Sequence, residues 1–239
     1  MPDNIKIDTS DIEVRILRTN RKSVVGHVLP NGNIEVCVPL SMTTEQIKKW
    51  LDRFEPQYLP IVKQRRELNA SLKAHPFGYG GGVLFRGEWI PIREAEDDNN
   101  GYMARYANGA VVMKPGLSEA DMRSHISYLF CDLAVPIFEK KLHHYSDIMD
   151  VWYKTWTIGN ARKSHGSCNS NRKITISWLV VMMSEPVIEL IIVHELLHLK
   201  CFDHSKTFRD ELAAILPDWK ERKNEHGKYT HMLSCSGWI

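Results

Sequence analysis

The chain of 239 residues has no long hydrophobic run and almost no excess of charge of one sign. Its apolar stretches are far shorter than the roughly 20 residues of a membrane-spanning helix, and its polar N-terminus lacks the apolar core of a signal peptide. We therefore expect a cytoplasmic protein that makes no membrane contact. A net charge of +2 creates no field that would draw the whole molecule to nucleic acid.

Cysteines are also sparse. The five of them are widely separated and include no CxxC pair: Cys37, Cys131, Cys168, Cys201 and Cys235. This pattern excludes a disulfide framework and a zinc ribbon, so we expect reduced thiols. What remains is an ordinary globular composition, 43% hydrophobic and 25% charged, without an internal repeat. Because no low-complexity linker interrupts the chain, we expect one compact unit over residues 1–239.

The N-terminal portion, residues 12–113, is predicted to be rich in β-strands. Strands at 24–29 and 34–38 flank Pro30-Asn31-Gly32-Asn33, and an asparagine–glycine pair is typical of a tight hairpin turn. Further strands are expected at 14–16, 83–85 and 88–92 and in a hairpin over 102–113, next to an acidic loop at 94–101.

A helix is expected within this portion, where Thr43 or Thr44 can cap the first free amides. Pro56 and Pro60 should disturb whatever follows, because proline lacks the amide hydrogen that a helix interior needs.

A second, longer helix is predicted over residues 119–145. Ser118 stands where an N-cap is expected, and Pro136 should kink the helix. His143 and His144 lie near its C-terminal end. They could be metal ligands, but a cation at the negative end of the helix dipole is the simpler interpretation.

The pattern changes after residue 150. Strands are predicted at 151–157 and 174–178, with a polar loop at 159–173 between them, and a helix should begin at Ser184-Glu185-Pro186. No acidic residue occurs from 151 to 184, whereas five basic residues do: Lys154, Arg162, Lys163, Arg172 and Lys173. This basic loop, residues 154–173, is either a solvated surface loop or a site that attracts nucleotide or nucleic acid.

The residues that point to chemistry lie in the segment 187–200, VIELIIVHELLHLK. It is apolar almost all round, so it should form a buried helix. Residues four apart share one helix face, about 40° apart, and His194 and His198 can therefore bind one cation. Glu195 projects to the side, where it can reach a metal-bound water. The structural alternative is a pair of core histidines bonded to backbone or carboxylate groups.

A third ligand is needed, and the spacing leaves three kinds open. His204 can fold back onto the metal if the chain turns after Lys200, since Ser205 or Lys206 then begins another helix. Cys201 is a rival if the helix continues, although a small buried residue is its simpler role. The third kind is a downstream acid, namely Asp218, Glu221 or Glu225. Of these, we favour His204.

These residues resemble the YgjP-like metallopeptidase domain, a zincin-type family that is distantly similar to SprT-like proteins. The resemblance rests on Gly166-Ser167-Cys168 with Ile174-Thr175-Ile176-Ser177-Trp178, on Pro186-Val187-Ile188 leading into Val193-His194-Glu195-Leu196-Leu197-His198-Leu199, and on Asp203-His204-Ser205 with Phe208. It is strong over roughly residues 150–216. The resemblance implies a zinc site of three histidines, which supports His204.

The resemblance also implies an α+β fold, with the β-rich portion, a long helix and a zincin-like half at 117–239. In that half a small sheet should pack on the metal-binding helix. Two positions depart from the family pattern: His165 replaces a usual tryptophan, and Ser177 replaces a usual asparagine. Substrate binding in this segment is therefore in doubt, and His165 is either a substrate contact or a surface histidine.

We expect a metal-dependent hydrolase holding one Zn²⁺ per chain, although cobalt, nickel or manganese could replace it. Three protein ligands leave a position for water, whose proton Glu195 takes as general base. Tyr153, Tyr229 and His231 are candidates to stabilise the oxyanion. The predicted substrate contacts are His165, Arg172 and Tyr229.

Four functions compete. The first is a zinc-dependent peptidase acting on a peptide or protein. The second is a nucleotide phosphohydrolase of the pyrophosphatase type, which would use the basic loop to hold phosphate. The third is a DNA-associated SprT-like protease. The last is a binding module with structural zinc, which Glu195 argues against because a structural site needs no acid beside its ligands.

Overall fold

The computed structural model describes residues 3–6, 12–96, 101–162 and 164–239. The fold is α+β, as predicted, and the chain divides into two compact units, Met1–Ala74 and His75–Ile239. The single unit expected from the sequence stays a prediction. None of the helices in the described ranges is long and apolar enough to cross a membrane.

The first unit contains a four-stranded sheet in the order β1-β2-β4-β3. Its strands are β1 (Asp3–Lys6), β2 (Glu13–Thr19), β3 (Val25–Val28) and β4 (Ile34–Pro39). The last three strands and the hairpin between β3 and β4 confirm the predictions, and Gly32 takes the positive φ of 85° that the turn requires. Ile16 and Val36 from this sheet pack with Ile47 and Leu51 of the following helix in one core.

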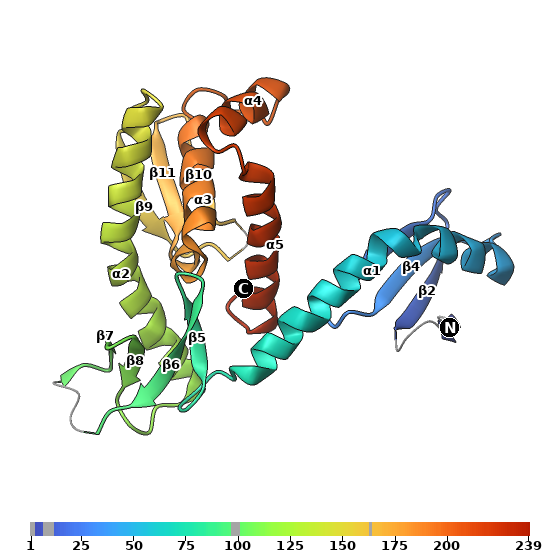
Figure 1. Ribbon diagram of the computed structural model, residues 1–239, viewed down its shortest axis with the longest axis horizontal. Helices are drawn as coiled ribbons and strands as arrows, with labels where there is room; N and C mark the ends of the chain where they lie inside the picture. Colours follow the sequence, from blue (N-terminus) through green and yellow to red (C-terminus); the bar gives the residue numbers. More distant parts are fainter. Residues whose placement is uncertain (1–2, 7–11, 97–100, 163) are drawn as a thin grey trace. The chain divides into compact units, whose positions relative to one another are not determined.

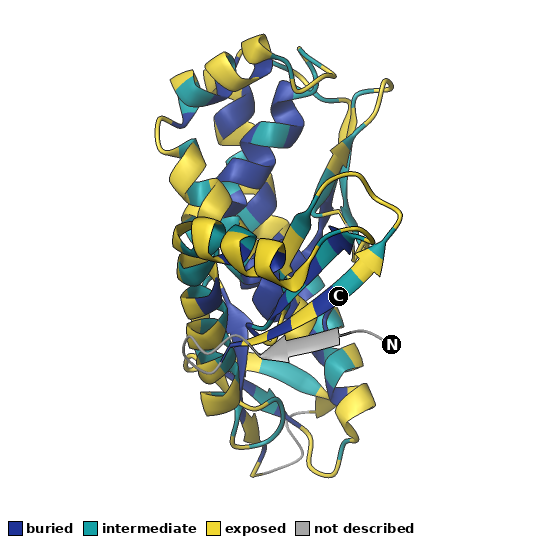
Figure 2. Cartoon of the chain, turned by 90° about the vertical axis from the view of Figure 1, so that its right-hand side faces the viewer, coloured by how far each residue is buried: buried dark blue, intermediate teal, exposed yellow. Residues whose placement is uncertain are grey.

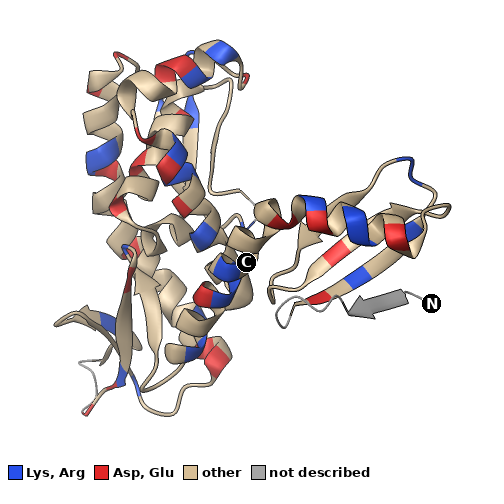
Figure 3. Cartoon of the chain, turned by 45° about the vertical axis from the view of Figure 1, so that its right-hand side comes forward, with Lys and Arg blue, Asp and Glu red and all other residues tan. Residues whose placement is uncertain are grey.

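That helix, α1 (Thr44–Ala74), begins as predicted but does not stop at its prolines. The Thr43 hydroxyl accepts a hydrogen bond from the Gln46 amide at 3.3 Å, which is a helix N-cap. Pro56 and Pro60 do not end the helix, because they lie four residues apart on an exposed face, but Figure 1 shows that α1 bends along its length. Water can therefore hydrate the carbonyls that lose an amide partner. Figure 3 shows basic and acidic residues interspersed along this helix.

The second unit begins with two hairpins joined into a sheet of order β5-β6-β8-β7. The strands are β5 (Gly82–Phe85), β6 (Glu88–Glu94), β7 (Ala104–Ala107) and β8 (Ala110–Met113), which confirms the predicted pairs. Both turns place two successive residues at positive φ, Arg86-Gly87 and Asn108-Gly109. The acidic loop predicted at 94–101 lies partly outside the described residues.

A long helix and a small sheet follow. Helix α2 (Glu119–Ile148) is capped by the Ser118 hydroxyl, as predicted, and continues through Pro136. The sheet has the order β10-β11-β9, with strands β9 (Thr155–Gly159), β10 (Gly166–Cys168) and β11 (Lys173–Ser177). The loop predicted at 159–173 is therefore partly wrong, because β10 pairs antiparallel with β11 inside it. Three residues carry too little periodicity to predict a strand.

The remaining elements surround one buried helix. They are η2 (Trp178–Met182), α3 (Glu185–Leu197), α4 (Lys206–Ile215) and α5 (Trp219–Cys235). Helix α3 contacts α2, α4, α5, β10 and β11, and Figure 1 shows it between α2 and α5. The C-terminal tail that the sequence left as a surface segment is α5, with Tyr229, His231, Met232 and Leu233 buried.

Ion pairs connect these helices at their polar edges. Lys141 of α2 bonds Glu185 and Glu189 of α3 at 2.7 and 2.8 Å. Arg86 bonds Glu185 at 2.6 Å, and Arg222 of α5 bonds Glu189 at 2.8 Å. These partners hold the pKa values of both glutamates below their usual range against the opposing effect of burial.

Candidate metal centre

Helix α3 places its ionisable residues at the end of an apolar segment. Nine of its thirteen residues are buried, and the buried residues of this unit concentrate around it (Figure 2). The helix ends at Leu197, with His198 as its C-cap, so the extension to residue 200 predicted from the sequence is wrong. The chain begins to turn earlier, because the Leu199 and Cys201 amides bond to the carbonyls of Leu196 and Leu197.

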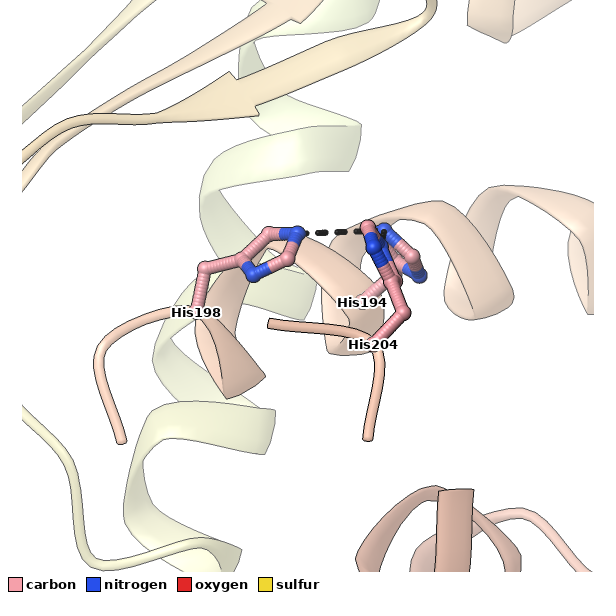
Figure 4. Close-up of side chains that lie close together, drawn as sticks. All are labelled: His194, His198 and His204. Atoms are coloured by element: carbon pink, nitrogen blue, oxygen red, sulfur yellow. Dashed lines mark hydrogen bonds between the residues drawn. The ribbon is translucent and has the colours of Figure 1, made fainter. Parts of the chain in front are cut away.

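Three imidazoles converge where the helix ends (Figure 4). His194 Nε2 lies 3.2 Å from His198 Nε2 and 3.0 Å from His204 Nε2. All three ligand atoms fall within 4.8 Å of one another, and the described residues contain no other such cluster of three. Tetrahedral zinc, with Zn–N distances of about 2.0–2.1 Å, separates its nitrogen ligands by about 3.3 Å. The donor set therefore fits a zinc ion.

The surroundings of the histidines also fit ligand roles. His198 Nδ1 lies 3.1 Å from the Cys201 carbonyl oxygen, which leaves the Nε2 lone pair for a cation. Burial and the two neighbouring imidazoles lower the pKa of His194 to about 4, so this side chain is in the neutral form that binds metal. The ring of Phe208 packs against all three imidazoles at centroid distances of 5.0 to 5.1 Å.

The turn between α3 and α4 brings His204 back to this cluster, as predicted. The Ser205 hydroxyl caps α4 by accepting a bond from the Phe208 amide at 3.4 Å. Arg209, one turn into α4, donates to the His204 carbonyl oxygen at 2.8 Å. These two hydrogen bonds hold the turn that carries His204, although the His204 side chain itself is exposed.

Glu195 lies beside the cluster and is 5% exposed. Its Oε2 atom is buried and has no hydrogen-bond partner among the described residues. Burial raises the pKa of this carboxyl to about 7. Gly166 makes the close approach of β10 feasible, since a Cβ atom there would lie 2.6 Å from Glu195 Oε1. A glycine is needed where the strand passes over the carboxylate.

A cavity of about 470 Å³ opens onto His194, Glu195 and His204. One part of its lining is apolar: Leu190, Ile191, Phe208, Leu212 and Trp219. Arg209 and Lys223 supply positive charge, and Glu195 is the single acid among the described residues that line the cavity. The cavity can therefore hold an apolar group and one that carries negative charge.

The rival third ligands lie elsewhere. Cys201 offers its carbonyl oxygen to His198, and its thiol belongs to no described metal-type cluster. Asp218 bonds Arg222 at 2.8 Å, and Glu225 accepts a hydrogen bond from Ser184 at 2.7 Å. Glu221 is exposed. The geometry therefore supports His204, and its role as a ligand stays a prediction.

Of the predicted substrate contacts, the structure places only His165 in the cavity. Arg172 donates two hydrogen bonds to the Trp152 carbonyl oxygen and lies over the Trp152 ring at 4.0 Å. Tyr229 is buried, with its hydroxyl 3.5 Å from the Gly87 carbonyl oxygen. Neither of these residues lines the cavity.

The oxyanion candidates are also absent from the described lining of the cavity. The ring of Tyr153 lies 6.3 Å from that of His143 of α2, and its hydroxyl is buried. His231 is buried in α5, with both ring nitrogens 3.7 Å from Cys235 Sγ. Tyr229, the third candidate, packs against Gly87 as described above.

Another cavity residue, His226 of α5, was not predicted from the sequence. Its Nε2 atom lies 3.0 Å from His165 Nδ1, and the two rings meet edge to face at 4.7 Å. Burial lowers the pKa of His165 to about 4 and also lowers that of His226. A helical periodicity over 219–235 would have been the available signal, but the polar residues of this segment obscure it.

Comparison with known proteins places the chain in a family. Residues 22–226 match the model of the YgjP-like metallopeptidase domain, so the chain belongs to this metallopeptidase family. The crystal structure of the metallopeptidase zymogen of Pyrococcus abyssi abylysin is 27% identical over 36% of this chain and 89% of that chain, with a TM-score of 0.34. No curated protein matches the sequence.

Proposed function

We propose that the chain is a zinc-dependent peptidase in which His194, His198 and His204 hold the metal and Glu195 is the general base. The convergence of three imidazole nitrogens beside a buried carboxylate without a partner carries this proposal. Membership of a metallopeptidase family supports a metal ion and a peptide substrate.

When bound, zinc lowers the pKa of a water molecule and polarises a carbonyl group. Glu195 accepts the proton of the attacking water at its carboxylate and passes it to the leaving amine. Burial raises the pKa of the Glu195 carboxyl, which favours its binding of the proton that it takes from the water. The apolar wall of the cavity excludes water around the reacting groups and holds the substrate in place.

Elemental analysis tests the ligand set. The wild-type chain should carry about one zinc per chain, and His204→Ala should lose it or bind it far more weakly, because two histidines do not complete the site. Cys201→Ala is the matched control and should keep full occupancy. Full retention in His204→Ala would assign the third ligand elsewhere. A wild-type chain without metal would favour the alternative in which the histidines have only a structural role.

Turnover of an unstructured protein such as casein tests the base. Glu195→Gln should keep its zinc and lose activity by about 10²–10⁴-fold, the usual contribution of a general base. His198→Ala should lose both metal and activity. Undiminished cleavage by Glu195→Gln would disprove the mechanism.

One observation favours the phosphohydrolase alternative. Arg209 and Lys223 line the cavity and could hold a phosphate, although Arg172 of the basic loop does not. Phosphate release from nucleotides, measured beside casein cleavage on the same zinc-loaded protein, separates the two functions. Salt-sensitive binding to single-stranded DNA would instead favour the SprT-like alternative.

A further inference from the structure

His165 and His226 form a pair of imidazoles within the same cavity as Glu195. His165 directly precedes Gly166, the first residue of β10 and the one packed on the Glu195 carboxylate, and it lines the same cavity as Glu195. His226 comes from α5. The pair therefore joins the residue that precedes β10 to helix α5 at the cavity lining.

Either His165 Nδ1 or His226 Nε2 could carry the hydrogen atom of this bond, and only one of these two arrangements suits the surroundings. His165 Nε2 is buried without a hydrogen-bond partner among the described residues. If His226 donated to His165 Nδ1, the neutral His165 ring would carry its proton on Nε2 as a buried, unpaired donor. An orphaned buried N–H is rarer than an orphaned acceptor. We infer that His165 Nδ1–H donates to His226 Nε2.

This arrangement determines the state of His226. With Nε2 accepting, the neutral ring carries its proton on Nδ1. No hydrogen bond joins Nδ1 to any residue in the described ranges, and this atom is not among the buried groups that lack a partner. The ring lines the cavity, and its Nδ1–H has no hydrogen-bond partner among the described residues.

We propose that His226 donates a hydrogen bond from Nδ1 to the substrate oxygen that gains negative charge during hydrolysis, with His165 as the residue that positions it. The proposal rests on the peptidase function proposed above. It gives the cavity an oxyanion donor that Tyr153, Tyr229 and His231 do not supply, since none of these three lines it. A preoriented neutral donor needs no proton transfer to stabilise the developing charge.

Matched substitutions at residue 226 test the donor. His226→Phe keeps the ring volume and removes the donor, whereas the amide nitrogen of His226→Asn occupies the place of Nδ1. His226→Phe should lower kcat for a casein-derived peptide by about 10²–10³-fold, the contribution of one oxyanion donor, with little change in KM. His226→Asn should recover most of this loss, and zinc content should not change in either variant. His144→Phe, an exposed residue of α2, is the control and should match the wild type.

Binding gives a readout besides turnover. The phosphonate analogue of that peptide carries a tetrahedral anionic group, and its affinity should fall in His226→Phe by about the same factor as kcat, whereas affinity for the product carboxylate should hardly change. His165→Phe should move both readouts in the same direction by a smaller factor. Equal phosphonate affinity in wild type and His226→Phe would overturn the proposal.

The tautomers can be measured without any substrate. Nitrogen-15 spectra of labelled histidine should show His226 protonated on Nδ1 in the zinc-loaded protein, and a proton on Nε2 would overturn the proposal. A zinc-loaded wild type that neither cleaves peptides nor binds the phosphonate would overturn the peptidase function itself. An active wild type with an equally active His226→Phe would overturn only the role of His226.

Discussion

Helices α1 and α3 bury very different shares of their surface. Three of the 31 residues of α1 are buried, whereas α3 buries nine of thirteen. Helix α1 carries Pro56 and Pro60 in its interior on an exposed face, and α3 carries Pro186 within its first turn, where no amide bond is lost. Because its prolines are exposed, α1 tolerates backbone carbonyls that have lost their amide partners. The buried surroundings of α3 would not tolerate such unpaired groups.

The same difference bears on chemistry. Around α3 little water can compensate a change, and burial shifts the pKa of Glu195 to about 7. Burial also raises the pKa of Tyr58 in α1, but no carboxyl, amino or guanidinium group of α1 is buried. A buried helix is thus the more suitable place for a reactive group, and the more sensitive one. Four changes test this contrast between the two helices.

The largest effect is expected from a cavity in α3. Ile192 is fully buried, and Ile192→Ala should lower the free energy of unfolding by about 2–5 kcal/mol through lost transfer energy and the void that remains. Ile61→Ala on α1 is the matched control, because Ile61 is 44% exposed, and it should change stability by less than about 1 kcal/mol. Urea denaturation measures both, and equal losses would contradict the contrast.

The second-largest effect is expected from a side chain that crowds the Glu195 carboxylate. Gly166→Ala places a Cβ atom 2.6 Å from Glu195 Oε1, and we expect a loss of about 1–3 kcal/mol in stability and of about 10²-fold in casein cleavage. Gly227→Ala in α5 meets no atom within 4 Å and should instead stabilise the helix by about 0.5–1 kcal/mol. Thermal denaturation measures the stability of both variants, and the casein assay measures their activity. If Gly166→Ala changed neither, β10 would be able to move away from Glu195.

Removing a proline should stabilise α1. Pro56→Ala restores a backbone amide to the helix interior, which should add about 1–2 kcal/mol after the higher entropy of the unfolded alanine chain is subtracted. Amide hydrogen exchange followed by mass spectrometry should then slow in the segment 50–60. Faster exchange would show that the helix depends on its prolines.

The smallest effect is expected from acid acting on the ion pairs of α3. Glu185 and Glu189 have lowered pKa values in the folded chain, so their stabilisation is complete above the unfolded value of 4.5 and is lost as the pH falls through the lower folded value. Glu189→Gln should cost about 1 kcal/mol at pH 7. The difference in stability between Glu189→Gln and the wild type should become smaller below pH 4.5. The midpoints of urea denaturation at several pH values measure it. The exposed pair Lys206–Asp210 provides the control, because Asp210→Asn should have no such effect.

The sequence predicted the elements whose signals are local. Asparagine–glycine turns, the Thr43 and Ser118 caps and the His-Glu-x-x-His spacing each depend on a few neighbouring residues, and the described turns, caps and helix match them. The return of the chain to bring His204 to the cluster was also predicted, because the Ser205 cap is a local signal.

The features that the sequence did not predict depend on distant contacts. Strand β10 exists because β11 pairs with it, and α1 continues through its prolines because their side of the helix faces solvent. His226 becomes a cavity residue only when α5 packs on α3, 32 residues away in sequence from His194. Arg172 lies outside the cavity lining for the same reason, since its guanidinium donates to the Trp152 carbonyl oxygen and lies over the Trp152 ring.

The place where α3 ends gives the proposed ligand set a thermodynamic consequence. Because His198 is the C-cap of α3 and His204 directly precedes the N-cap of α4, an ion bound by both would cross-link the two helices. By linkage, zinc at about 1,000 times its dissociation constant would add about 4 kcal/mol to folding. Chelators should therefore lower the melting temperature, and free zinc in the cell would decide how firmly α4 stays docked.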